Sequence, residues 1–366
     1  MTTLSGYTLP FNSSGAPVTK GRATILNTAN RFEPLHLELD PVEPDDPATK
    51  QSPANTQYFI DNSRSALSAN NSPDIDFRFS INPYRGCEHG CIYCFARPTH
   101  EYLGFSAGLD FETKIIIKSE LPELLADTLR KKSWKPQPIA LSGNTDCYQP
   151  IERKLQITRR CLETFLEFRN PVTIITKNHL VVRDLDLLKD LAALNLVNVT
   201  LSITSLQRDL INFMEPRTSR PEQRLSTIEK LATNNVPVGV NISPLIPGLN
   251  DHETPEIMSE VTKRGGKWAG FKMLRLPGIV APLFLDWLHR TLPDQAEKIL
   301  RQIQKVRRGR INDPHFGSRM TGDGELAKVT STLFLIARRK HGLANNEPQL
   351  TTHHFRATPT NQLDLF

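Results

Sequence analysis

The chain contains no run of about 18 or more apolar residues, so the sequence predicts no membrane-spanning helix and no membrane partner. Its opening residues, Met1–Tyr7, lack a basic start followed by an apolar stretch, and a secretory signal is not expected. Cysteine is scarce, and its odd count of five argues against a disulfide framework. These absences favour a folded protein of the reducing cytoplasm.

The charge balance is only mildly basic. The 366 residues carry a formal net charge of +6, with 38% hydrophobic and 23% charged residues. This composition supports one large folded domain, or one domain with appendages. The charge permits a polyanionic partner such as nucleic acid but does not require one.

Three of the five cysteines lie together in Asn82–Cys94, at the spacing Cys-x3-Cys-x2-Cys, as Cys87, Cys91 and Cys94. Soft thiolates in such a group select an iron–sulfur cluster, zinc or copper(I). A structural zinc site requires four protein ligands. A [4Fe–4S] cluster held by three cysteines instead keeps one iron free to bind a small molecule.

The nearest candidates for a fourth zinc ligand are His89, His100 and the distant Cys147. His89 is equally well interpreted as a residue that tunes a cluster through a hydrogen bond and as a solvent-facing side chain. His100 is a candidate for a supporting contact. A closed zinc site therefore remains the alternative to an open cluster.

From residue 77 onward, short apolar runs alternate with amphipathic helical patterns. Six runs predict strands: Phe77–Ile81, Pro138–Leu141, Val172–Thr176, Val199–Ile203, Val238–Ile242 and Gly270–Leu274. Helices are expected at Leu121–Leu129 with Ser119 as its cap, Leu155–Phe168 with Leu155 facing inward, Leu185–Leu194, Pro221–Asn234 and Thr254–Lys263. Lys114–Lys118 predicts a small extra strand. The alternation indicates βαβ units, a parallel sheet and the α/β class.

Polar residues follow most of the predicted strands. They are Asn82, Ser142–Asp146, Lys177, Asn178, Ser202, Thr204, Asn241, Ser243 and Arg275. Chemistry at many strand ends is typical of a barrel, whereas a doubly wound sheet gathers it at one crevice. We therefore expect a partial (β/α)6 TIM-like barrel.

The chain is expected to divide into four parts. They are an extended, partly disordered arm (1–75), in which Asn30–Glu33 and Tyr58–Ile60 are candidates to dock, the barrel (76–280), a helical C-terminal extension (281–345) and a flexible tail (346–366). Within the extension, Arg307, Arg308 and Arg310 are interpreted as a solvated helix end or a phosphate contact.

The cysteine loop follows a predicted strand and places aromatic Tyr93 before its last cysteine, and in this it resembles the radical S-adenosylmethionine (radical SAM) superfamily. Ser142–Glu152 and Glu215–Leu225 are similar to segments of the branch that contains spore photoproduct lyase. The likeness covers roughly residues 75–280. The whole chain looks like uncharacterised, photolyase-labelled bacterial members of that branch.

The resemblance implies an enzyme with a [4Fe–4S] cluster and S-adenosyl-L-methionine (SAM) as cofactors. Reduction by a low-potential donor of ferredoxin or flavodoxin type would cleave SAM to a 5′-deoxyadenosyl radical, which abstracts hydrogen from the substrate. The implied metal ligands are Cys87, Cys91 and Cys94, and the implied cofactor contacts are Ser142, Gly143, Asn144, Thr145, Lys177, Ser202, Arg217 and Ile242. A nucleic-acid lesion or base, as in DNA repair by a lyase, is the favoured substrate class, and a peptide or small metabolite is the competitor.

Several residues keep two interpretations. Cys147 is either a radical quencher or a small buried hydrophobe, and Tyr148 either gates the radical or fills a pocket. Arg217 either binds the cofactor carboxylate or pairs with Glu215. Two carboxylates, Asp146 and Glu152, are expected to cap a following helix rather than bind substrate. The alternative function is a non-catalytic iron–sulfur or zinc-binding module.

Overall fold

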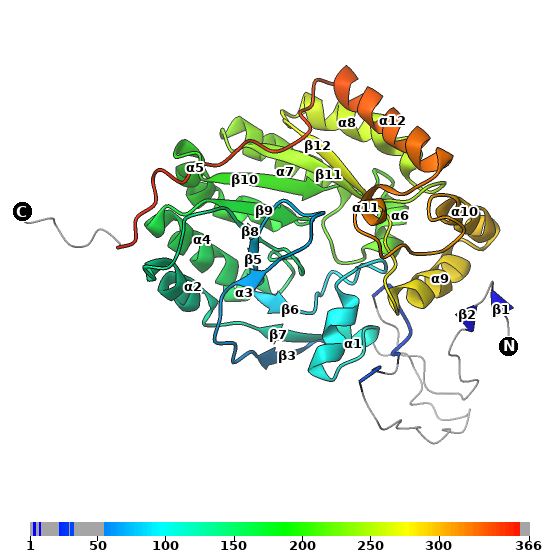
Figure 1. The fold of residues 1–366 in the computed structure, drawn as a ribbon, viewed down its shortest axis with the longest axis horizontal. Coiled ribbons are helices and arrows are strands. Elements are labelled where there is room, and N and C mark those ends of the chain that lie inside the picture. The colour runs from blue at the N-terminus through cyan, green and yellow to red at the C-terminus, as the bar shows by residue number, and fades with distance from the viewer. Residues whose placement is uncertain (1–2, 5–6, 9–21, 29, 33–54, 359–366) are drawn as a thin grey trace, which may run out of the picture.

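The computed structural model describes residues 3–4, 7–8, 22–28, 30–32 and 55–358 (Figure 1). Much of the predicted arm, and residues 359–366 of the predicted tail, lie outside the described residues. Near the start of the chain, β1 (Thr3–Leu4) and β2 (Tyr7–Thr8) form an antiparallel pair.

A seven-stranded sheet in the order β12-β11-β10-β9-β8-β5-β4 forms the centre of the molecule. Its strands are β4 (Ser68–Ala69), β5 (Phe79–Ile81), β8 (Ile139–Leu141), β9 (Val172–Thr176), β10 (Val197–Ser202), β11 (Val238–Leu245) and β12 (Ala269–Met273). The six strands from β5 to β12 are parallel neighbours in sequence order, and only β4 is antiparallel. The predicted α/β class with a parallel sheet is confirmed.

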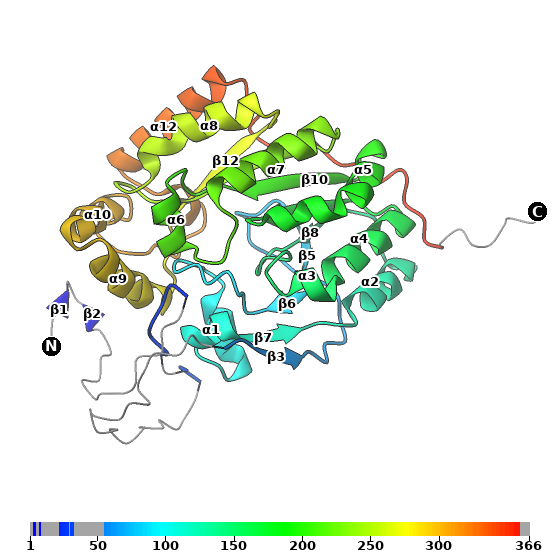
Figure 2. The same ribbon diagram turned by 180° about the vertical axis from the view of Figure 1, so that it is seen from behind.

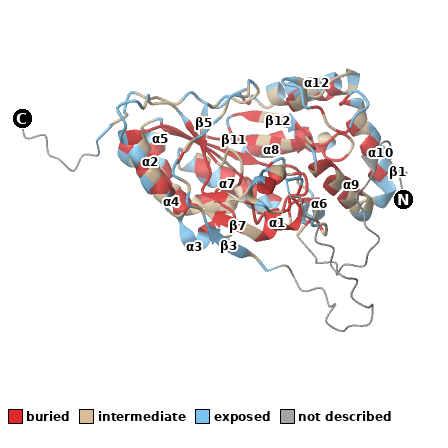
Figure 3. Ribbon diagram, turned by 60° about the horizontal axis from the view of Figure 1, so that its bottom comes forward, coloured by how far each residue is buried: buried red, intermediate tan, exposed pale blue. Residues whose placement is uncertain are grey.

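Helices follow the strands and cover the sheet, as the two opposite views show (Figures 1 and 2). They are α2 (Leu121–Arg130), α3 (Glu152–Leu155), α4 (Ile157–Phe168), η3 (His179–Asp184), α5 (Leu185–Ala193), α6 (Arg208–Met214), α7 (Pro221–Thr233), η4 (Asp251–Glu253) and α8 (Thr254–Lys263), where η marks a 3-10 helix. Buried residues concentrate on the strands and on the inner sides of these helices (Figure 3).

Two local expectations are wrong. The helix predicted from Leu155 is interrupted, because Gln156 adopts a left-handed backbone (φ 53°) between α3 and α4, and Leu155 is exposed rather than inward-facing. Ser119 does not cap α2, since the residue at the N-cap is Glu120 and no side-chain cap forms. Both errors concern helix starts, where the apolar period carries little information.

A smaller sheet in the order β3-β7-β6 docks part of the predicted arm. Its strands are β3 (Gln57–Ile60), β6 (Tyr84–Arg85) and β7 (Lys114–Ile117), and η2 (Arg97–Leu103) and α1 (Leu109–Thr113) lie between β6 and β7 in the chain. The predicted extra strand is thus confirmed as β7, and the predicted docking of Tyr58–Ile60 as β3. Asn30 docks as well, because its side chain donates to the carbonyls of Glu101 (2.9 Å) and Phe105 (3.3 Å).

The C-terminal part is helical, as expected. It contains α9 (Val280–Thr291), α10 (Pro293–Lys305), α11 (Ser318–Thr321) and α12 (Glu325–Lys340). Arg307 contradicts both of its interpretations, because it is 1% exposed and donates to the carbonyls of Leu274 (2.6 Å) and Ser318 (2.8 Å). No helix in the described ranges is both long and apolar enough to span a bilayer.

Part of the predicted flexible tail packs against the domain. The amide of Thr351 donates to the carbonyl of Asn195 (3.1 Å), and the amide of Arg356 donates to that of Phe168 (2.9 Å). Residues 345–358 therefore run along the outside of the sheet and helices (Figure 1).

α11 and the loop before it touch segments that border both edges of the large sheet. Arg319 pairs with Asp74, which lies between β4 and β5, at 2.5 Å. The amide of Leu276, just after β12, donates to Asn312 at 3.0 Å. Contacts that connect the two edges in this way are expected if the sheet is curled. The partial barrel itself stays a prediction.

Candidate functional site

The three cysteines lie on the loop that leaves β5 and β6. Gly86 and Gly90 have φ values of 76° and 65°, which side chains rarely tolerate. A Cβ at Gly86 would lie 2.9 Å from the carbonyl oxygen of Lys114, and one at Gly90 would lie 2.7 Å from Cβ of Arg22. Both turns therefore require glycine, and the loop is packed on its outer side.

The side chain of Arg97 holds the backbone of the cysteine loop in place. Its guanidinium donates to the carbonyl of Cys91 through Nε (3.0 Å) and Nη2 (2.9 Å), and to that of Gly108 (2.9 Å). It also forms an ion pair with Glu112 at 2.6 Å, and both side chains are fully buried. Carbonyls of an irregular buried loop thus find donors that no regular secondary structure supplies.

Gln149 and Glu88 join the cysteine loop to the segment after β8. The Gln149 side chain accepts from the amide of Glu88 (2.8 Å) and donates to the carbonyl of Gly86 (3.2 Å). The Glu88 carboxylate accepts from the amide of Ile151 (2.8 Å). Glu88 also pairs with Arg217 at 3.0 Å, whereas Glu215 pairs with Arg224, so the alternative interpretation in which Arg217 pairs with Glu215 is wrong.

The three thiols are the candidate ligands of a [4Fe–4S] cluster. In the described part of the chain, no group of three His, Cys, Asp or Glu side chains is close enough to hold one metal ion. A [4Fe–4S] cluster has its irons at separate corners, so its thiolates stand farther apart than the ligands of one zinc. Burial raises the pKa of all three thiols, so cluster binding must supply the free energy that removes their protons.

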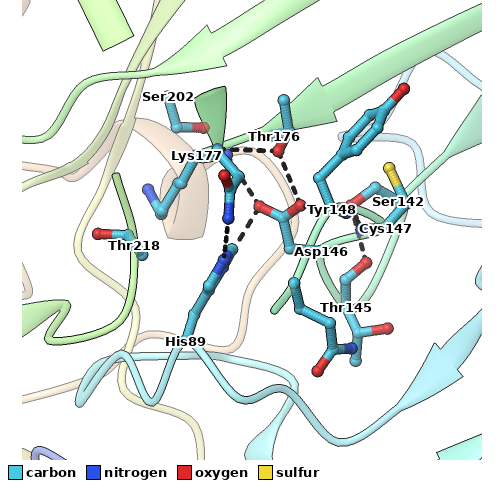
Figure 4. A network of polar contacts seen from close by, with 12 residues as sticks. His89, Ser142, Thr145, Asp146, Cys147, Tyr148, Thr176, Lys177, Ser202 and Thr218 are labelled. Carbon is cyan, nitrogen blue, oxygen red and sulfur yellow. Dashed lines mark hydrogen bonds and ion pairs between the residues drawn. The ribbon is translucent and has the colours of Figure 1, made fainter. Parts of the chain in front are cut away.

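Asp146 connects the cysteine loop to the ends of two strands (Figure 4). Its carboxylate accepts from the Thr176 hydroxyl (2.7 Å) and the Lys177 amide (2.8 Å), and it lies 3.5 Å from Nδ1 of His89. The other ring nitrogen of His89 lies 3.1 Å from Nδ2 of Asn178. Asp146 is therefore a bridge between loops and not a helix cap.

His89 is 1% exposed, which overturns the solvent-facing interpretation. Burial lowers its pKa, although the neighbouring Asp146 carboxylate acts in the opposite direction. A neutral ring can donate to Asp146 through one nitrogen and accept from Asn178 through the other.

A second buried network centres on Glu215. It pairs with Arg224, accepts from the Tyr93 hydroxyl, and lies 3.5 Å from Nζ of Lys177. Burial alone would raise the pKa of Glu215, but the charges of Arg224 and Lys177 hold it well below its usual range. Lys177 Nζ also donates to the carbonyl of Ser243 at 3.0 Å. The ammonium group of Lys177 is thus fixed close to the ends of β9 and β11. Tyr93, which belongs to the cysteine loop, joins this network through its hydrogen bond to Glu215.

The turn from Ser142 to Thr145 is held by its own hydroxyls. Ser142, at φ 81°, donates to the carbonyl of Thr145 (2.7 Å), and Thr145 donates to the carbonyl of Tyr84 (2.5 Å). The amide of Asn144 donates to the Asn82 side chain (2.7 Å). Gly143 is needed for space, because a Cβ there would lie 2.7 Å from Cβ of Ser80. The turn is therefore rigid and lies beside the start of the cysteine loop.

Two further predicted cofactor contacts lie on the neighbouring strands. Ser202 ends β10, and its carbonyl accepts from Arg224 at 2.9 Å. Ile242 is fully buried on β11. The structure brings Ser142, Lys177 and Ser202 to adjacent strand ends (Figure 4). Arg217 is instead paired with Glu88 of the cysteine loop.

Cys147 and Tyr148 point into the main core and are fully buried. The Tyr148 hydroxyl donates to Asp184 at 3.1 Å. The cluster cysteines pack in other groups of side chains. Packing is thus the better interpretation of both residues, and their catalytic role stays a prediction.

Glu152 accepts from the amide of Thr158 at the start of α4 (3.1 Å), as a cap would.

Sequence reasoning missed the residues that hold the loop. They are Arg97, Glu112, Gln149, Glu88 and Arg224. The only sign of these residues in the sequence is that several charged residues lie close to the cysteines. Charged side chains are usually exposed to solvent, so this sign is weak. Their partners are up to 129 residues away in the chain, so periodicity cannot reveal them.

Comparison with known proteins agrees with this geometry. The family model described as the radical SAM superfamily matches residues 81–261. An uncharacterised protein of Mycobacterium tuberculosis is 32% identical over 248 residues, which cover 67% of this chain and 72% of that protein. An uncharacterised protein of Methanocaldococcus jannaschii is 30% identical over 222 residues, covering 61% and 79% of the two chains.

Among solved structures, the fold is similar to spore photoproduct lyase complexed with dinucleoside spore photoproduct. The TM-score is 0.53 at 16% identity, with 78% of this chain and 80% of that chain covered. A mutant of spore photoproduct lyase with bound AdoMet and dinucleoside spore photoproduct gives a TM-score of 0.50 at 15% identity, with 69% and 79% covered. At these identities the likeness concerns the fold.

His100 provides a test of the packing around the loop. It is fully buried, its ring nitrogens have no hydrogen-bond partner among the described residues, and burial lowers its pKa to about 4 from 6.5. The unfolded chain takes up a proton below pH 6.5 and the folded chain does not until about pH 4, so stability present at pH 7 is lost as the pH falls. Between pH 7 and 5 this loss is about 2 kcal/mol.

We expect His100→Phe to remove that part of the pH dependence, measured by urea unfolding at both pH values. The exposed His252, replaced in the same way, serves as the matched control and should leave the pH dependence unchanged. Equal pH dependence in His100→Phe and the parent protein would contradict the account.

Proposed function

We propose, since the chain belongs to the radical SAM superfamily, that it binds a [4Fe–4S] cluster through Cys87, Cys91 and Cys94 and uses SAM to start radical chemistry. The observation that carries this proposal is the placement of three thiols on one rigid loop beside the carboxyl ends of parallel strands. When bound and reduced, the cluster supplies the electron that cleaves SAM and yields the hydrogen-abstracting radical.

The chain's own residues would bind and orient SAM. The rigid turn Ser142–Thr145 offers backbone and side-chain groups for the methionyl amine. Lys177 supplies a positive charge for the carboxylate, and Ser202 a hydroxyl at the neighbouring strand end for the ribose. Ile242 would pack against adenine. Arg217 is a weaker candidate, because Glu88 already neutralises it.

For the substrate we propose a nucleic-acid lesion or base. The support is the likeness in fold to a lyase solved with a dinucleoside photoproduct, together with the net charge of +6. A peptide or small metabolite is the competing class. A low-potential electron donor is a required partner of this chemistry.

The cluster ligands can be tested with a matched pair of cysteines. Cys91→Ala should lose cluster iron and reduce the release of 5′-deoxyadenosine to background after anaerobic reconstitution and reduction. Cys161→Ala, which removes a buried thiol in α4, should retain both. Release of 5′-deoxyadenosine by Cys91→Ala at the rate of the parent would refute the assignment.

The proposed role of Lys177 predicts weaker SAM binding when its charge is removed. Lys177→Met should raise the Kd of SAM roughly ten-fold or more, as expected for a lost hydrogen bond to a charged group. Glu215 keeps Arg224 as its partner, so the fold should survive. Equilibrium dialysis on the cluster-loaded protein measures the effect, and the exposed Lys189→Met is the control. An unchanged Kd would exclude Lys177 as a SAM contact.

The substrate class predicts salt-sensitive binding of single-stranded DNA or RNA. About three phosphate contacts would weaken binding roughly 20-fold between 50 and 200 mM salt, because each contact releases counterions. Fluorescence anisotropy with a labelled oligonucleotide measures this. Absence of binding at 50 mM salt would favour the peptide or metabolite class.

A further inference from the structure

The edge strand β3 exposes an apolar surface close to the cysteine loop. Tyr58, Phe59 and Ile60 are 45%, 38% and 74% exposed, and β3 pairs with β7 on one side only. Natural proteins usually protect such an edge with charge or cover. An exposed apolar edge near a candidate redox centre is therefore a candidate interaction surface.

Among the described residues, three ion pairs near this edge expose the cation more than the acid. Arg85 pairs with Asp61, with side chains 41% and 9% exposed. Arg217 is 40% exposed while its partner Glu88 is 1% exposed, and Lys114 is 31% exposed while Asp110 is 12% exposed. In these three pairs the acidic partner is more buried than the cation, so the pairs present positive charge to solvent.

A continuous row of rings joins this face to the cysteines. The ring of Phe59 lies 5.5 Å from that of Phe105, which lies 5.3 Å from His100, which lies 5.6 Å from Phe111. Phe111 packs with Cys87 and Cys94. The carbonyl of Phe111 also accepts from the amide of Cys87 at 2.9 Å. The exposed edge is therefore connected to two of the three thiols by side chains that pack against one another.

The face lies apart from the strand ends that would hold SAM. The three-stranded sheet and α1 lie below the seven-stranded sheet in Figures 1 and 2. Lys177 and Ser202 belong to the seven-stranded sheet, whereas β3, β7 and β6 form the smaller one. A partner on β3 could therefore approach the cysteines without blocking the strand ends.

We propose that this exposed edge face of the small sheet, with Phe59, Lys114 and Arg85 on one side of the sheet and Tyr58, Ile60 and Arg217 on the other, is where the reductant docks. The partner is an acidic, low-potential electron-transfer protein of the ferredoxin or flavodoxin class. The proposal rests on the proposed function. One electron leaves the donor's reduced cofactor and arrives on the oxidised cluster, and no bond or proton changes place. The rate of electron tunnelling falls steeply with distance. The donor must therefore dock where packed side chains connect the protein surface to the cluster.

The chemistry of the face fits such a partner. Electron-transfer encounters bury small interfaces and depend on complementary charge for fast association. Exposed aromatic rings with cations would also suit a nucleic acid. The row of rings ends at the cysteines and not at the strand ends, and this favours the electron donor.

The test uses the full chain with a reconstituted cluster and an acidic flavodoxin as the probe. Ile60→Glu places a negative charge at the exposed end of β3. It should raise the Kd for flavodoxin and slow cluster reduction by flavodoxin hydroquinone at least ten-fold, measured by calorimetry and stopped-flow absorbance. Reduction of the cluster by dithionite should not change, since dithionite needs no docking surface.

Ile336→Glu on α12 is the matched control, because Ile336 is also an exposed isoleucine (56%). It should behave as the parent, whereas Lys114→Glu should repeat the effect of Ile60→Glu. Flavodoxin reduction of Ile60→Glu at the parent rate would overturn the proposal. Weaker oligonucleotide binding by Ile60→Glu, with flavodoxin binding unchanged, would also overturn the proposal. Failure of dithionite-reduced parent protein to cleave SAM would instead refute the proposed function, and flavodoxin binding would remain measurable.

Discussion

The buried ion pair between Arg97 and Glu112 is the interaction on which the cysteine loop depends. The loop is almost devoid of regular structure, so its carbonyls need donors from elsewhere, and Arg97 supplies them to Cys91 and Gly108. Removing one partner of a buried pair typically costs about 3 to 5 kcal/mol, because the other charge is left uncompensated. The intact pair therefore holds the loop in one conformation before any cofactor binds.

Two further carboxylates connect the cysteine loop to the strand ends. Asp146 joins the loop to β9 through His89 and Lys177, and Glu215 joins it through Tyr93 and Arg224. The charge of Glu215 is balanced by Arg224 and Lys177, and Asp146 accepts hydrogen bonds from the Thr176 hydroxyl and the Lys177 amide. The loop thus lies between two differently built surfaces. The large sheet contributes polar groups suited to SAM, and the small sheet presents the cationic, aromatic face proposed for the reductant.

Much of the architecture could be predicted, since the apolar runs that form β9 and β11 are long enough to show their period. The three cysteines were also evident from spacing alone. The supports were not predictable, because Arg97 or Glu88 looks like any surface charge until its distant partners are known. Arg307 shows the same limit, since a cluster of arginines on a helix end does not reveal that one of them turns inward.

The central claim is that three thiols hold a cluster whose remaining iron is open to SAM. Its most direct test is the electron paramagnetic resonance spectrum of the reduced, reconstituted protein with and without SAM. The account predicts a [4Fe–4S]+ signal whose g-values shift when SAM is added, because the amine and carboxylate bind the open iron. A [4Fe–4S]+ signal that SAM leaves unchanged, or a chain that binds zinc in place of the cluster, would contradict it.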